Sequence, residues 1–123
     1  MSTSLVPRLR RLRQHPKLRQ LVCETRLSVE DFIYPIFVVA GDNTQQPIEA
    51  MPGQYQWSVD RLPELLEQID NAQIPAVLLF GVPAEKDAEG SHSWCDDGIV
   101  QQACRLIRER APELLCIADV CFC

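Results

Sequence analysis

The chain has 123 residues, of which 46% are hydrophobic and 24% charged, and its net charge is −5. This composition is typical of a globular domain and excludes a disordered chain. No run of about 18 apolar residues is present, which excludes a transmembrane helix within this sequence. An Arg-rich N-terminus without an apolar segment behind it is not a secretory signal, so we expect a cytoplasmic protein whose six cysteines are thiols.

Charge divides the chain into two parts. Residues 1–26 contain seven basic residues and one acid, whereas residues 27–123 contain five basic residues and sixteen acids. We therefore predict an N-terminal arm over 1–26, interrupted by Pro16, and a globular part over 27–123. A basic arm can bind nucleic acid or an anionic membrane, contact an acidic surface of another subunit, or remain a solvated tail.

The first half of the globular part reads as strand, loop and helix. The segment 32–39 is apolar and rich in β-branched and aromatic residues, which predicts a strand buried on both faces. The segment 41–56 is polar and without period, which predicts a loop. Ser58 is expected to cap a helix that runs to Ile69, with Pro63 in its first turn. Trp57 is expected to pack in a loop or interface.

The second half repeats this order. A short apolar strand is predicted over 76–81, a long polar loop over 82–98, an amphipathic helix over 99–110 and a third strand over 114–119. Strand–helix repeats predict a parallel sheet, either doubly wound or part of a (β/α)8 barrel. Because a closed barrel takes about 250 residues, the α/β fold expected here is incomplete: about three strands and two helices.

Three side chains at the end of the third strand could carry chemistry. Asp119, Cys121 and Cys123 alternate along the chain, so an extended backbone places all three on one face. Two thiolates can hold Zn²⁺, with a third protein ligand still needed. Spacing alone nevertheless favours buried cysteines over a metal site. The other cysteines are expected to be buried or incidental thiols and not metal ligands; they are Cys23, Cys95, Cys104 and Cys116.

Six fragments, in order, resemble the porphobilinogen synthases, also called δ-aminolevulinic acid dehydratases. The resemblance covers nearly the whole chain and is most specific at Asp-Val-Cys-Phe-Cys. The fragments are Pro7–Arg13, Tyr34–Val38, Met51–Gly53, Leu79–Pro83, Lys86-Asp87 with Gly90-Ser91, and Asp119–Cys123.

The resemblance implies a (β/α)8 TIM barrel that assembles as a homo-octamer through its N-terminal arm. It implies a hydro-lyase of heme and tetrapyrrole biosynthesis that condenses two 5-aminolevulinate molecules into porphobilinogen. By position, Cys121 and Cys123 correspond to two of three cysteine ligands of an active-site zinc, and Asp119 to the acidic residue beside them. The family forms Schiff bases through two lysines, which neither Lys17 nor Lys86 matches. The chain is therefore expected to be an N-terminal fragment, inactive alone.

Two alternatives remain open at this point. One is a truncated metal-binding or thiol module that uses Cys121 and Cys123. The other is nucleic-acid binding by the arginines of the arm, which the acidic body disfavours; these are Arg8, Arg10, Arg11 and Arg13.

Overall fold

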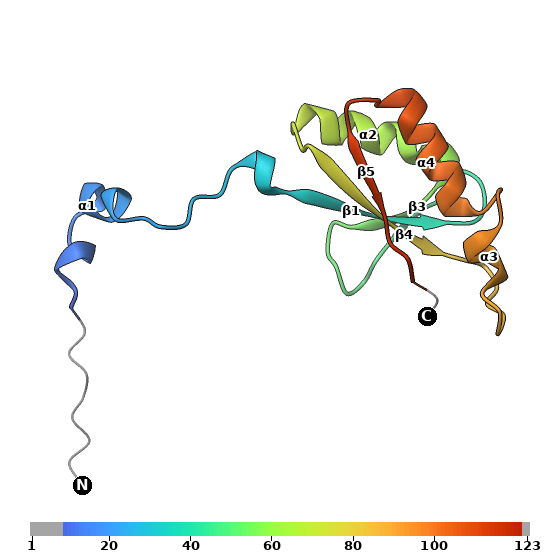
Figure 1. Cartoon of the computed structure of the whole chain (residues 1–123), viewed down its shortest axis with the longest axis horizontal. Coiled ribbons are helices and arrows are strands. Elements are labelled where there is room, and N and C mark those ends of the chain that lie inside the picture. The colour runs from blue at the N-terminus through green and yellow to red at the C-terminus, as the bar shows by residue number, and fades with distance from the viewer. Residues whose placement is uncertain (1–8, 122–123) are drawn as a thin grey trace, which may run out of the picture.

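The computed structural model describes residues 9–121, and its N-terminal part is an arm that extends away from the body (Figure 1). In the structure the arm extends beyond residue 26 to the start of the sheet. It contains a 3-10 turn, a short helix and a second 3-10 turn: η1 (Arg11–Arg13), α1 (Pro16–Leu21) and η2 (Val29–Asp31). Pro16 breaks the arm as predicted, but it does so by starting α1, where its missing N–H costs no hydrogen bond. No residue of these three elements is buried.

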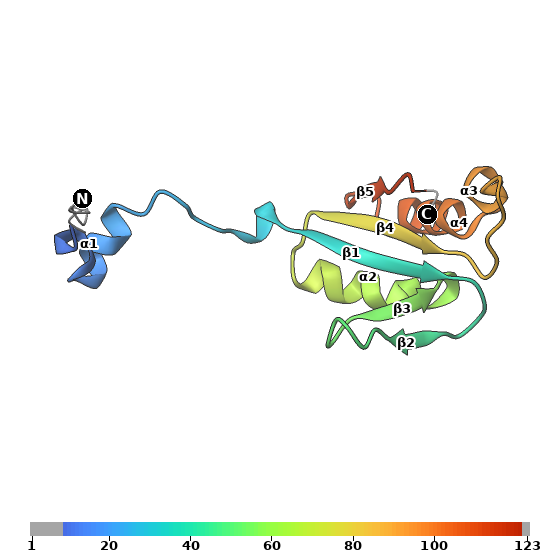
Figure 2. The same ribbon diagram turned by 90° about the horizontal axis from the view of Figure 1, so that it is seen from below.

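The body is built on one five-stranded sheet with the order β2-β3-β1-β4-β5, which Figure 2 shows from bottom to top. β1, β3, β4 and β5 are mutually parallel, and β2 runs antiparallel to β3. The central strands β1 and β4 pair over seven residues each. The bounds are β1 (Ile33–Val39), β2 (Gln45–Pro47), β3 (Tyr55–Ser58), β4 (Ala76–Val82) and β5 (Leu115–Ala118).

The predicted loop over 41–56 is wrong in part, because this segment contains β2 and the start of β3. The side chains of β2 are exposed, so an edge strand of this kind leaves no hydrophobic pattern in the sequence. Pro47 lies at the end of β2, at the edge of the sheet, where proline is tolerated. Trp57 in β3 is only 4% exposed, so its expected place in a loop or interface is also wrong.

Two long helices, α2 (Leu62–Asn71) and α4 (Ile99–Arg110), cover one face of the sheet. The shorter elements are η3 (Val59–Arg61) and α3 (Ser91–Trp94). Both helices turn an amphipathic face to the strands, as their spacing predicted. The buried core comprises Ile36, Val38, Trp57, Leu62, Leu65, Leu66, Ile69, Val77, Leu79, Ala103 and Ile107.

Ser58 does not cap a helix with its side chain as predicted. It precedes η3 without a side-chain capping bond, and it is fully buried. Its Oγ accepts a hydrogen bond from the Thr44 backbone N–H at 2.8 Å and donates to the Thr44 carbonyl oxygen at 3.4 Å. Ser58 therefore fastens the segment before β2 to the end of β3.

The opposite face of the sheet is covered by neither α2 nor α4. Phe37 of β1 and Phe80 of β4 are opposite one another in register and stack there, with ring centroids 5.3 Å apart. Both rings are half-buried. Within residues 9–121, no helix is long and apolar enough to cross a membrane.

Candidate metal site at the carboxyl edge of the sheet

The parallel strands end at one edge of the sheet, where Asp119 follows β5. The backbone N–H of Asp119 donates to the Leu79 carbonyl oxygen at 3.0 Å, which continues the β4–β5 ladder by one residue. This register sets Asp119 opposite Phe80, on the face that α2 and α4 leave uncovered. The carboxyl edge is where parallel α/β folds place their chemistry.

Cys121 lies two residues beyond Asp119, and both residues are exposed. Regular strand structure ends at Ala118, before Asp119, so the predicted alternation of Asp119, Cys121 and Cys123 on one strand stays a prediction. Cys121 is disulfide-bonded in the structure and must be reduced before its thiolate can bind a metal. Cys123, the other predicted ligand, lies outside the described residues.

Zinc takes carboxylate oxygens and thiolate sulfurs as ligands, so the side chains of Asp119 and of reduced Cys121 are suitable donors. The described part of the chain nevertheless contains no group of three or more His, Cys, Asp or Glu side chains able to hold a metal ion. Asp119 and Cys121 therefore form no complete metal site within residues 9–121.

The loop after β4 opens at the same edge and is organised by Asp87. Its carboxylate accepts hydrogen bonds from the backbone N–H groups of Ser91 at 3.0 Å and Glu89 at 3.1 Å. The bond from Ser91 is the largest of several that lower the pKa of Asp87. Gly90 adopts a left-handed φ of 63° within this turn, which favours glycine. Lys86, Asp87, Gly90 and Ser91 form a recognisable motif in the sequence, but their spacing does not indicate that Asp87 shapes the loop.

The two lysines of the chain lack the surroundings of a covalent catalyst. Lys17 lies in α1 and Lys86 in the loop after β4, and both side chains are exposed. A lysine that forms Schiff bases needs a desolvated, neutral amine. Neither Lys17 nor Lys86 is desolvated in this way.

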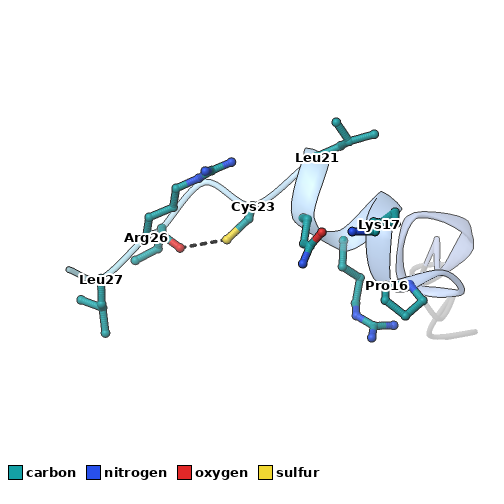
Figure 3. Close-up of a pocket in the computed structure, with 9 residues that line it drawn as sticks. Pro16, Lys17, Leu21, Cys23, Arg26 and Leu27 are labelled. Carbon is teal, nitrogen blue, oxygen red and sulfur yellow. Dashed lines mark hydrogen bonds between the residues drawn. The ribbon is translucent and has the colours of Figure 1, made fainter.

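Two hollows in the described structure lie away from the carboxyl edge. One, of about 950 Å³, runs along the arm between α1 and Leu27, where the Cys23 thiol donates to the Thr25 carbonyl oxygen at 2.8 Å (Figure 3). The other lies where α2 and α4 end, beside Pro75 and Leu114, which precede β4 and β5. Neither hollow includes Asp119 or Cys121.

Parallel strands, helices on one face and long loops with polar residues at the carboxyl edge define part of an α/β-barrel enzyme. Comparison with known proteins identifies the family of α/β-barrel enzymes to which the chain belongs. The family described as delta-aminolevulinic acid dehydratase matches residues 6–123, and the chain belongs to this family.

Individual relatives agree with this assignment. The chain is 50% identical over 116 residues to the delta-aminolevulinic acid dehydratase of Halalkalibacterium halodurans, and 49% identical over 117 residues to that of Helicobacter pylori. Each alignment covers 94% of this chain, but only 35% and 36% of the respective relative. The chain thus spans about a third of the length of these relatives.

A solved structure shows the same arrangement. The delta-aminolevulinic acid dehydratase of Toxoplasma gondii, determined with the reaction product porphobilinogen, matches with a TM-score of 0.84 and 31% identity. The match covers 97% of this chain and 34% of that one. That neighbour is a TIM barrel, so the prediction of a partial (β/α)8 barrel is confirmed.

Proposed function

We propose that this chain contributes the N-terminal part of a porphobilinogen synthase, the enzyme that condenses two 5-aminolevulinate molecules into porphobilinogen with loss of two waters. The observation that carries the proposal is the family match over residues 6–123. The position of Asp119 and Cys121 at the carboxyl edge of the sheet supports it.

The proposed zinc ligands in this chain are Cys121 and Cys123, with Asp119 as the acidic residue beside them. When bound, zinc supplies a Lewis acid that polarises a substrate oxygen. The chain would position these ligands. β5 pairs with β4, and Asp119 and then Cys121 follow β5 at the carboxyl edge of the sheet.

Schiff-base formation is assigned to lysines other than Lys17 and Lys86, since both are exposed. The polypeptide alone is therefore expected to form no porphobilinogen. The test is a colorimetric assay of porphobilinogen from 5-aminolevulinate and zinc, with the chain alone and with the remaining two thirds of a related enzyme. Turnover by the chain alone would contradict the proposal, and turnover only in the mixture would support it.

The arm is proposed to contact neighbouring subunits of a homo-octamer in the cytoplasm, and not membrane or nucleic acid. Its leucines support this role, because Leu9, Leu21 and Leu27 are 91%, 80% and 76% exposed. Such apolar side chains among arginines are typical of a segment that packs on another protein surface. Salt-sensitive retention on DNA, lost without residues 1–26, would contradict this part of the proposal.

A second candidate function is a metal-binding or thiol module that uses Cys121 and Cys123. The observation that favours it is the disulfide state of Cys121 in the structure. If the reduced chain binds one zinc ion tightly without the rest of a barrel, the module is supported; if zinc binds only in the reconstituted mixture, the enzyme is supported.

A further inference from the structure

Cys104 and Cys116 come from different elements and meet at the edge of the core. Cys104 lies in the middle of α4, and Cys116 is the second residue of β5. Their Sγ atoms are 3.9 Å apart, with the Cys116 thiol donating to the Cys104 sulfur. Both side chains are partly buried and pack against the hydrophobic core.

Buried residues beside Cys104 and Cys116 hold the two sulfur atoms close together. Ala103, directly before Cys104, and Ile107, one turn later, are both fully buried and hold α4 on the sheet. Cys116 is paired in register with Val77, which is also fully buried. The two sulfurs are therefore brought together by the packed core and not by a mobile loop.

We propose that Cys104 and Cys116 form a reversible disulfide, with a small-molecule disulfide such as oxidised glutathione as the oxidant. A disulfide has an S–S distance of about 2.05 Å, so the two sulfurs, now 3.9 Å apart, must approach by about 1.9 Å to form the bond. The bond would join α4 to β5 just before Asp119. This inference concerns a thiol pair outside the candidate metal site and does not depend on the proposed enzymatic function.

The thiol–disulfide exchange proceeds in two steps. The Cys104 thiolate attacks one sulfur of oxidised glutathione, and the leaving glutathione thiolate takes up a proton. The Cys116 thiolate then attacks the Cys104 sulfur and expels the second glutathione. Two protein thiols become one disulfide, and one glutathione disulfide becomes two glutathione thiols.

Burial sets the order of these steps. Burial, with a smaller contribution from the Cys104 thiol, raises the pKa of Cys116 to about 11. Cys116 is therefore a poor first nucleophile, and exchange begins at Cys104. The neutral disulfide suits the same apolar surroundings, whereas a thiolate at Cys116 does not.

Cys23 and Cys95 make contacts of a different kind. The Cys23 thiol donates to the Thr25 carbonyl oxygen in the arm, and the Cys95 thiol has its pKa raised chiefly by a hydrogen bond with Asp97. Free thiols at these two positions serve as internal controls for the reaction at Cys104 and Cys116.

The test uses a full-length variant that retains only Cys104 and Cys116, with substitutions Cys23→Ser, Cys95→Ser, Cys121→Ser and Cys123→Ser. The protein is equilibrated with mixtures of reduced and oxidised glutathione, alkylated and weighed by mass spectrometry. We expect an intramolecular disulfide whose equilibrium constant is at least about tenfold larger in native buffer than in concentrated urea. An equal constant in both, or accumulation of glutathione adducts without a cross-link, would overturn the proposal.

A measurement on the unaltered sequence guards against misfolding of this variant. Arg105, Arg108 and Arg110 lie between the two cysteines, so trypsin places Cys104 and Cys116 in different peptides that only a disulfide keeps together. Fragment spectra must assign the linkage to Cys104 and Cys116, and Cys104→Ser must abolish it while Cys95→Ser preserves it. Linkage through Cys95 instead would count against the proposal.

Discussion

The backbone of Gly81 in β4 lies directly against the side chain of Val100 in α4. A Cβ atom at Gly81 would sit 2.6 Å from the Val100 Cγ2, closer than two carbon atoms can approach. Glycine at this position is therefore what lets α4 lie on the carboxyl end of β4. The contact also explains why Gly81 ends the apolar run in the sequence.

Gly81→Ala is predicted to lower the free energy of unfolding by about 1–3 kcal/mol, the usual cost of overpacking a core. The measurement is urea unfolding followed by circular dichroism. The matched control is the double variant Gly81→Ala, Val100→Ala, which removes the clashing methyl groups and should recover part of the loss. Equal losses in the single and double variants would show that the Val100 contact is not the cause.

Ser58→Ala is predicted to lower the free energy of unfolding by about 1–3 kcal/mol, because the substitution leaves the Thr44 N–H without its buried acceptor. Amide hydrogen exchange of Thr44 should quicken in parallel. Ser93→Ala, at an exposed position of α3, is the matched control and should change stability by less than about 0.5 kcal/mol. Unchanged exchange at Thr44 would refute the role assigned to Ser58.

Alkaline pH is predicted to destabilise the fold through Cys116. Its pKa is raised from 9.0 to about 11 by burial and by the Cys104 thiol, so between these values the folded thiol keeps a proton that the unfolded thiol loses. Stability from this group is complete below pH 9 and falls as pH rises towards 11. The effect is modest, since Cys116 is only partly buried and solvent screens its charge.

The measurement for Cys116 is the slope of unfolding free energy against pH in this window. Cys116→Ala should flatten the slope relative to the unaltered chain, whereas Cys23→Ala in the exposed arm should not. Identical slopes for all three proteins would contradict the assignment.

Zinc binding by the reduced chain, mixed with the remaining two thirds of a related enzyme, is predicted to weaken by more than about tenfold on Cys121→Ser, since a hydroxyl is a far poorer zinc ligand than a thiolate. Competition with a chromophoric chelator under a phosphine reductant gives the affinity. Cys95→Ser, in the loop before α4, is the matched control and should bind zinc unchanged. A loss shared by both variants would point to a general effect on folding.

Local pattern predicted β1, β4, β5, α2 and α4, whose side chains face the core, but it missed β3, although Trp57 of that strand is buried. The helix over 99–110 was predicted to the residue, because Ala103 and Ile107 recur on one buried face. β2 could not be predicted in this way: its residues are exposed, and it exists through backbone pairing to β3, which no local pattern encodes. The role of Ser58 escaped for the same reason, since its partner Thr44 lies fourteen residues earlier.

The candidate site was predictable only in part. Strand periodicity placed Asp119 correctly at the carboxyl end of the third apolar strand, where the structure continues the ladder to Leu79. The spacing of the cysteines along the sequence does not indicate that Cys121 is disulfide-bonded. The approach of Cys104 to Cys116 depends on how α4 folds back on the sheet, so incidental thiols were the natural expectation from sequence.

The uncovered face around Phe37 and Phe80 changes how folding of this chain must be monitored. A polarity-sensitive dye will fluoresce on the native sheet, because half-buried aromatic rings already offer it a surface. Dye fluorescence therefore cannot serve as a measure of a molten state here. Because one sheet face stays hydrated before and after denaturation, calorimetry should give a heat-capacity increment per residue below the usual ~12–15 cal/mol/K.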